Sequence, residues 1–258
     1  MNTNKLLCYL AVKYNGEWQK IYDAIKTKEP VNNEILDRGL KDFNNQYITL
    51  LDEIYPERYK SSFQDPPIVL FYKGDISLLK NPKLKYLSVV GSRDASEYGK
   101  SVVASIVYNL SDDFCIVSGL AKGIDSVAHQ AALDSNKKTI AFLGSGIDYV
   151  YPEENKELYQ RIIDNGGLIM SEYPGFAQPK KENFTFRNRL VAGLSDVLLV
   201  GEAYSRSGTS VTVNYALQGN CQICCVPYEA GVNSICNSLI KEGAALVENS
   251  QDVAQLYQ

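Results

Sequence analysis

Leu87-Ser-Val-Val-Gly-Ser-Arg93 is a short apolar run that ends in glycine, serine and arginine, and an amphipathic segment follows it. In the following segment, apolar residues recur at spacings of three and four, which is typical of one helical face: Val102, Val103, Ile106, Val107 and Leu110. This order predicts a β-strand, then a polar turn, then an α-helix.

The same alternation continues toward the C-terminus. Apolar runs at 114–117, 139–143, 168–170, 197–200 and 223–226 each precede a helical pattern, which after 168–170 is expected at 187–194, and the run at 245–247 ends the series. Because strands buried on both faces are apolar almost throughout, these runs indicate a mostly parallel sheet between two layers of helices. The predicted fold is an α/β, extended Rossmann-like, doubly wound sheet.

The N-terminal part of the chain has a different pattern. Residues 1–45 carry helix-favouring apolar residues without a strand pattern, which predicts a small helical N-terminal unit. Residues 46–258 then form the Rossmann-like domain, with its motifs at 86–248. Pro66 and Pro67 enforce extended chain before the apolar run 68–72, for which we expect an edge strand.

Composition narrows the class of protein. The 258 residues include 26 Lys+Arg and 30 Asp+Glu, a net charge of −4, and 45% hydrophobic residues, as in ordinary globular proteins. No run of about 18 apolar residues or signal cleavage pattern occurs, so we expect a cytoplasmic protein that does not contact membranes. The six cysteines show no spacing typical of a disulfide framework, and the chain has one histidine. We therefore expect no disulfide framework, no metal site and no cofactor.

Small and hydroxyl residues follow four of the predicted strands, where parallel sheets bind anions. They are Gly91, Ser92 and Arg93; Ser118 and Gly119; Ser145 and Gly146; and Ser207, Gly208 and Thr209. A single loop of this kind more often serves only to turn the chain. Four such loops at the carboxyl ends of one sheet predict a phosphate-binding cleft. The dinucleotide and Walker patterns are absent, which argues against NAD and ATP as phosphate-loop ligands.

The segment 178–189 concentrates positive charge in this acidic chain. Four cations and one carboxylate give it a net +3: Lys180, Lys181, Arg187 and Arg189 against Glu182. Phe184 and Phe186 alternate with the cations, and Asn188 lies between the arginines. Cations that follow phosphates and rings on which bases stack are the two parts of a single-strand site. The alternative is a helix start whose phenylalanines face the core.

Few residues suit enzymatic catalysis. His129 lies in a helical context, where a histidine more often makes a local hydrogen bond, and Asp125 is better explained as a capping acid. Glu172 and Glu202, each just beyond a strand end, keep an enzymatic interpretation open.

Six motifs lie in order along the chain. They are Gly91-Ser-Arg93 with Tyr98-Gly99, Ser118-Gly-Leu-Ala-Lys-Gly-Ile-Asp125 with Ala128-His129, Gly144-Ser-Gly-Ile-Asp148 with Tyr151-Pro152 and Asn155, Ser171-Glu-Tyr-Pro174, Phe184-x-x-Arg-Asn-Arg-Leu-Val-Ala-Gly193, and Ser207-Gly-Thr209. From about Asp65 to Ala245, the chain thereby resembles the DNA-processing protein A family (DprA, also called Smf).

The resemblance implies a bacterial, cytoplasmic homodimer without enzymatic activity. It implies sequence-independent binding of incoming single-stranded DNA, its protection, and loading of the RecA recombinase during natural transformation. By position, Arg93 is similar to the family's phosphate-binding arginine, and Lys181 and Phe184 to its lysine and base-stacking phenylalanine. Arg187-Asn-Arg189 matches the family's Arg-Asn-Arg element, in which we expect at least one residue to order the loop. Thr185 stands where the family usually has proline.

Two other functions stay open. Nucleotide phosphoribohydrolases share a related fold, but their Pro-Gly-Gly-x-Gly-Thr signature is replaced here by Ser205-Arg-Ser-Gly-Thr209. A sensor of a free nucleotide would use the same cleft without needing Lys181 and Phe184 outside it.

Overall fold

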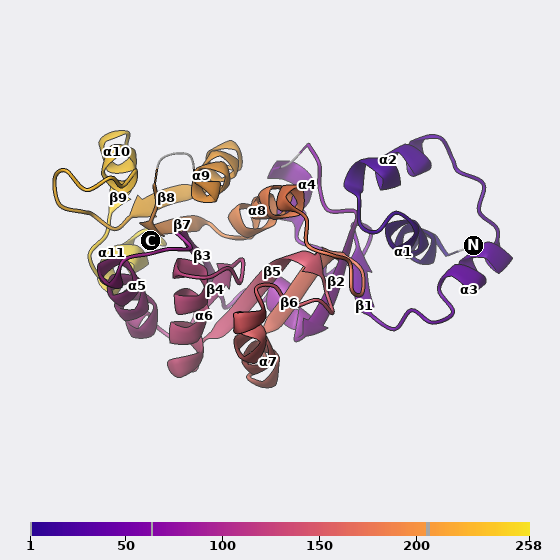
Figure 1. Cartoon of the computed structure of the whole chain (residues 1–258), viewed down its shortest axis with the longest axis horizontal. Coiled ribbons are helices and arrows are strands. Elements are labelled where there is room, and N and C mark those ends of the chain that lie inside the picture. Colours follow the sequence, from indigo (N-terminus) through magenta and orange to yellow (C-terminus); the bar gives the residue numbers. More distant parts are fainter. Residues whose placement is uncertain (1, 63, 205–206) are drawn as a thin grey trace.

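A single sheet organises the molecule. The computed structural model describes residues 2–62, 64–204 and 207–258, in which nine strands lie in the order β1-β2-β6-β5-β4-β3-β7-β8-β9 (Figure 1). β1 and β2 are antiparallel to their neighbours, and the pairs from β6 to β9 are parallel. The strands are β1 (Gln46–Thr49), β2 (Val69–Gly74), β3 (Lys85–Gly91), β4 (Phe114–Ser118), β5 (Lys138–Gly146), β6 (Leu168–Tyr173), β7 (Val197–Glu202), β8 (Gln222–Cys225) and β9 (Ala245–Leu246).

Helices cover both faces of the sheet. Leu87 and Val89 of β3 pack against α5 and α6, whereas Val90 of the same strand belongs to the cluster under α8 and α9. Each fully buried side chain of this kind contributes roughly 1.5–3 kcal/mol to folding. The helices are α1 (Thr3–Lys13), α2 (Trp18–Lys26), α3 (Asn33–Gly39), α4 (Glu57–Ser62), α5 (Glu97–Asn109), α6 (Ile124–Asp134), α7 (Lys156–Asp164), α8 (Lys181–Leu194), α9 (Gly208–Gln218), α10 (Cys236–Lys241) and α11 (Ser250–Gln255). The predicted doubly wound, mostly parallel sheet is confirmed.

Three helices occupy the N-terminal end of the chain, α1 to α3, at one end of the molecule (Figure 1). Leu7 and Leu10 of α1 and Ile21 of α2 share a hydrophobic cluster with β2 and β6, so these helices rest on the sheet. The boundary at residue 45 between two units stays a prediction. Within the described ranges, no helix is long and apolar enough to cross a membrane.

Two local predictions were wrong. β2 lies one strand inside the edge, because β1 pairs with its outer side through Gln46–Thr49. The helix expected at 187–194 begins six residues earlier, at Lys181, after Pro179 and an extended Lys180 with φ −122°. Its first two turns lack a continuous apolar stripe, since residues 181–186 are polar or aromatic, which hid the helix start from the spacing argument. Lys181 and Phe184 consequently lie on the first turn of α8.

Candidate nucleic-acid interface

A cleft of about 690 Å³ opens at the carboxyl ends of β3 and β4, beside the N-termini of α8 and α9. We call it the strand-end cleft. The predicted site residues that line it are Gly91, Ser92, Arg93, Gly119, Lys181, Phe184, Arg187, Asn188, Ser207, Gly208 and Thr209. Loops far apart in sequence therefore meet at one place, as their positions after parallel strands require.

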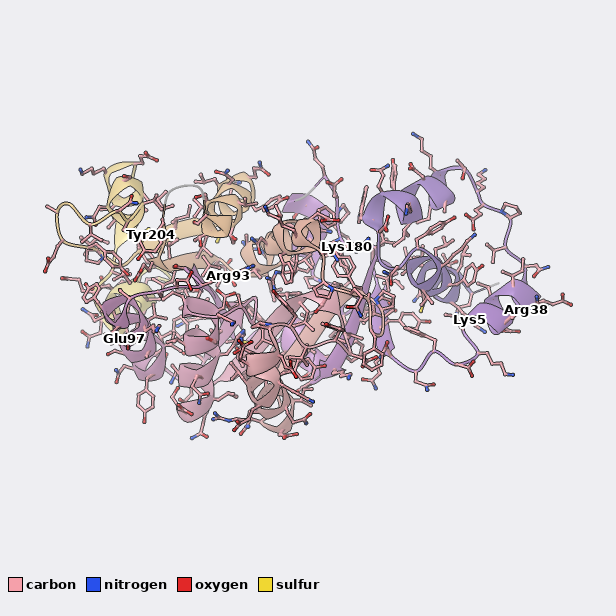
Figure 2. All side chains as sticks on the ribbon, in the orientation of Figure 1. Lys5, Arg38, Arg93, Glu97, Lys180 and Tyr204 are labelled. Carbon is pink, nitrogen blue, oxygen red and sulfur yellow. The ribbon has the colours of Figure 1, made fainter. Side chains whose placement is uncertain are left out.

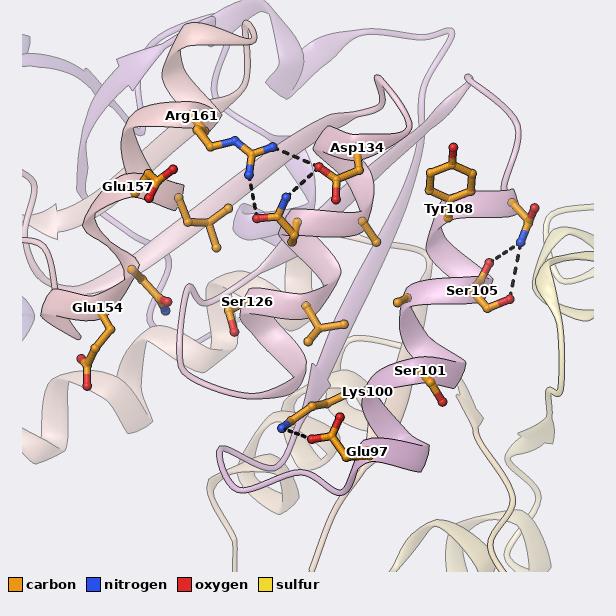
Figure 3. A pocket seen from close by; sticks show the side chains of 17 residues that line it. Glu97, Lys100, Ser101, Ser105, Tyr108, Ser126, Asp134, Glu154, Glu157 and Arg161 are labelled. Carbon is orange, nitrogen blue, oxygen red and sulfur yellow. Dashed lines mark hydrogen bonds and ion pairs between the residues drawn. The ribbon is translucent and has the colours of Figure 1, made fainter.

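A larger hollow of about 910 Å³ lies elsewhere, on the outer surface of α5, α6 and α7 (Figure 3). Its cations pair with its own carboxylates, Lys100 with Glu97 at 2.9 Å and Arg161 with Asp134 at 3.0 Å. None of the residues predicted for the site lines it. The hollow therefore offers little unpaired positive charge to a nucleic acid.

Arg93 presents an exposed positive charge to the strand-end cleft. Its guanidinium carbon lies 5.6 Å from the centre of the Phe184 ring, and among the described residues no carboxylate forms an ion pair with it. The backbone before it is fixed, because Ser92 N–H donates to the Glu202 carbonyl at 2.7 Å. At Gly91, a Cβ atom would lie 2.4 Å from the Ile124 side chain, so glycine permits the close packing of this turn.

Phe184 forms an aromatic surface beside Arg93. Its half-buried ring lies 5.3 Å from the ring of Tyr151, which is 43% exposed. A Cβ atom on Gly144 would lie 2.5 Å from the Phe184 ring, so this glycine makes room for it. Sequence reasoning placed Tyr151 in a motif but gave it no role. An exposed aromatic next to a proline at a strand-end loop was the available signal.

Arg187 is an internal cation that joins two strand ends to α8. Buried in the floor of the strand-end cleft, it donates to the carbonyl of Gly119 at 2.7 Å and to that of Phe142. Burial, partly offset by the nearby Asp125 carboxylate, lowers the pKa of Arg187 to about 10, so the guanidinium stays charged at neutral pH. Asp125 accepts from the Gly119 and Ala121 N–H groups, so it caps the preceding loop and not the start of α6.

Arg189 lies outside the lining of the strand-end cleft. It is 1% exposed, donates to both carboxylate oxygens of Glu172 at 2.6 and 2.7 Å, and its guanidinium carbon lies 3.6 Å from the Phe186 ring centre. Lys180 is exposed and 3.4 Å from a carboxylate oxygen of Glu17. Much of the local +3 charge is thus neutralised within the protein.

Lys181 is the other exposed cation of the strand-end cleft. It forms no ion pair with the residues that the structure describes. Together with Arg93, it supplies the positive charge that a ligand in the cleft would meet.

Three other predicted residues serve the scaffold. Ser118 Oγ donates to the Val89 carbonyl at 2.6 Å, and Ser145 Oγ to the Tyr149 carbonyl at 2.7 Å. The Gly146 N–H donates to the carbonyl of Ala177 at 2.8 Å. These donors are therefore already engaged with protein acceptors.

The start of α9 faces the same cleft. Ser207 is its N-cap residue but caps no N–H with its side chain, and its buried Oγ has no hydrogen-bond partner within the described structure. Asn188 Nδ2 donates to the Gly208 carbonyl at 3.3 Å, which links α8 to α9. The first N–H groups of a helix lack intrahelical acceptors and attract anions. Ser205 and Arg206, the preceding residues of this motif, lie outside the described residues.

The candidate catalytic groups are occupied by structural contacts. Glu172 pairs with Arg189, and Glu202 accepts from Ser96 Oγ at 2.6 Å and from Tyr228 at 2.9 Å. Burial raises the pKa of Glu202, but these hydrogen bonds outweigh it and lower the pKa overall. His129 is buried, its Nδ1 lies 2.6 Å from Thr139 Oγ1, and burial lowers its pKa to about 3. No cluster of metal-binding side chains occurs in the described ranges.

The fold and the site define a Rossmann-like α/β protein with a cleft at the carboxyl ends of its strands. The cleft presents two exposed cations and an aromatic ring. Residues 46–258 match the model of one family, DNA recombination-mediator protein A. The chain belongs to this family.

Known relatives agree with this assignment. DNA processing protein DprA of Streptococcus pneumoniae is 44% identical over 207 residues, which are 80% of this chain and 72% of that protein. The X-ray structure of DprA from Streptococcus pneumoniae superimposes with a TM-score of 0.78 and 34% identity, covering 97% of this chain and 92% of the other. DNA processing protein A from Helicobacter pylori, whose structure gives insight into its single-stranded DNA binding mode, has a TM-score of 0.73 and 31% identity and covers 83% and 95% of the two chains.

Proposed function

We propose that this chain binds single-stranded DNA without sequence preference in the strand-end cleft. The observation that carries the proposal is the arrangement of Arg93 beside Phe184, with Lys181 one turn away on α8. Phosphates require cations and every base offers a face for stacking, so this combination suits a single strand of any sequence. The relative from Helicobacter pylori, with its single-stranded DNA binding mode, supports the same ligand.

In the proposed complex, each exposed group has a separate task. Arg93 holds one phosphate, and Lys181 holds another. Phe184 stacks on a base, with Tyr151 supporting its ring. Arg187 stabilises the floor of the strand-end cleft, because its hydrogen bond to the Gly119 carbonyl joins that loop to α8.

The proposed biological role follows from family membership. The chain acts in the cytoplasm as a homodimer that protects incoming DNA and helps to load the RecA recombinase during natural transformation. The family description, a recombination mediator, supports this role. Two copies would also bring two local basic surfaces together, which suits a chain with a net charge of −4.

Catalysis is not part of the proposal. His129 is buried with its pKa lowered to about 3, and Glu172 is engaged by a guanidinium, so neither is placed to transfer a proton to a ligand. A free nucleotide in the strand-end cleft is the alternative that an experiment must separate from DNA.

Fluorescence anisotropy of a labelled oligothymidine at two salt concentrations separates these ligands. Duplex DNA and AMP serve as competitors. Tight, salt-sensitive binding that neither competitor displaces supports the single-strand function. Binding or cleavage of AMP without binding of the strand would replace it with a nucleotide enzyme or sensor.

A further inference from the structure

Phe176 is an exposed aromatic residue that the strand-end cleft leaves unused. It lies between β6 and α8, and its side chain is 72% exposed, more than any other large apolar side chain in the described part of the chain. An isolated apolar side chain on a surface is common and by itself implies no function. For Phe176, the fixed loop that carries it and the cleft near that loop indicate a function.

The backbone on both sides of Phe176 is fixed. The carbonyl of Ala177 accepts from the Gly146 N–H at 2.8 Å, and the Gly175 N–H donates to Asn45 Oδ1 at 3.0 Å. A Cβ atom on Gly146 would lie 2.2 Å from the Gly175 carbonyl oxygen, so the loop rests directly on β5. The ring is therefore presented on an ordered support, which lowers the entropy lost on stacking.

β5, on which this loop rests, also supports the ring of Phe184. Gly144 packs under the Phe184 ring, and Gly146, two positions further along β5, packs under the loop of Phe176. Two residues span at most about 7 Å of chain. The loop that carries Phe176 therefore packs on β5 two positions from the residue on which the Phe184 ring packs.

Two exposed lysines lie on the segment that joins this loop to α8. Lys180 and Lys181 follow Phe176 on the same segment, and both side chains are exposed. Figure 2 shows Lys180 between Arg93 and the N-terminal helices. A strand that leaves the cleft in this direction passes Lys180, whose side chain lies 3.4 Å from a carboxylate oxygen of Glu17.

We propose that Phe176 stacks on a base of the single strand where it leaves the strand-end cleft, which extends the site beyond Phe184. This inference rests on the proposed function and names a further contact of the same ligand. A single ring among polar neighbours, Gln178 and Lys180, suits a base better than a protein partner, because protein docking uses a contiguous apolar area. Exposed Tyr151 adds an aromatic face on the side of Phe184.

The first test compares Phe176→Ala with the unchanged chain on oligothymidines of about 4 and about 12 nucleotides, within the range of known site sizes. We expect the affinity for the longer strand to fall about fivefold or more, as for loss of one stacked base. The salt slope and the affinity for the short strand stay unchanged, because the lost contact involves no phosphate and lies outside the cleft. Leu51→Ala, at a 54% exposed side chain, is the matched control.

The second test introduces a fluorophore at the same place. Phe176→Trp should be quenched by oligothymidine beyond the quenching of Trp18, the one tryptophan of the unchanged chain, and should restore affinity for the longer strand. Equal losses on both lengths for Phe176→Ala, or unchanged affinity with no added quenching, overturn the role of Phe176 while the cleft still binds DNA. Failure of the unchanged chain to bind either strand overturns the proposed function itself.

Discussion

The guanidinium of Arg189 donates to both carboxylate oxygens of Glu172, at 2.6 and 2.7 Å, in the interior between α8 and β6. Both side chains are at most 4% exposed. The pair anchors the helix that carries Lys181 and Phe184 to the strand after which the loop of Phe176 begins. Because the pair is buried, loss of one partner would leave an unpaired charge in the interior.

Arg189→Met should destabilise the protein by about 3–5 kcal/mol, because it leaves the Glu172 carboxylate buried without its cation. Urea unfolding measures this free energy. Arg58→Met, which removes a cation from an exposed pair with Asp196, should cost about 1 kcal/mol or less. Similar costs for both variants would contradict the anchoring role of the buried pair.

Arg93→Ala should weaken binding of every single-stranded sequence and reduce the slope of log affinity against log salt by about 0.7, the value for one phosphate on a single strand. Anisotropy titrations between low and moderate salt give this slope. Lys100→Ala removes a cation on α5 that is paired with Glu97 and should leave the slope unchanged. An unchanged slope in Arg93→Ala would exclude a phosphate contact there.

Phe184→Ala should cost about 1–3 kcal/mol of binding free energy and leave the salt slope nearly unchanged, because stacking involves a base and no phosphate. The same titrations test both quantities. Tyr108→Ala, at an exposed aromatic on α5, controls for general loss of surface rings. A slope reduced as much as in Arg93→Ala would mean that the two residues do not divide phosphate and base between them.

Gly144→Ala should impair DNA binding without any contact of residue 144 with DNA. The added Cβ atom would lie 2.5 Å from the Phe184 ring, and so the ring must shift from its place beside Tyr151. We expect a loss of affinity close to that of Phe184→Ala. In the double variant the two losses should not add, because both act on the same ring. Additive losses would show that Gly144 acts elsewhere.

The sequence predicted the sheet because parallel strands buried on both faces leave a strong apolar pattern, as at Leu87–Val90. It also predicted which loops meet, since every parallel strand ends at the same edge. It could not tell whether Arg187 or Arg189 contacts DNA, because two arginines in one cationic segment look alike until their burial is known. The partner that neutralises Arg189, Glu172, lies seventeen positions away on another element.

The boundaries of single helices were harder to predict than the sheet, because they depend on residues that do not face the core. The first turns of α8 carry Lys181 and Phe184 toward the cleft, so a helical stripe facing the core is missing there. Phe176 showed no signal in the sequence, since only its 72% exposure on a fixed loop distinguishes it from a core phenylalanine. The residues that sequence patterns describe best are those that build the core.

The burial of His129 predicts that the free energy of unfolding depends on pH. Burial lowers its pKa from 6.5 to about 3, so between these values the unfolded chain binds a proton that the folded chain does not. Stability must therefore fall as the pH drops below 6.5, with a slope that approaches about 1.4 kcal/mol per pH unit.

Urea unfolding from pH 7 to pH 5 isolates this effect, because His129 is the one histidine of the chain and most carboxylates titrate below that window. In His129→Gln the slope over this range should largely vanish, even if the variant is less stable throughout. The comparison uses slopes and so does not depend on the absolute cost of the substitution. An equal slope in both proteins would mean that the folded protein protonates His129 as readily as the unfolded chain, against its burial beside Arg187.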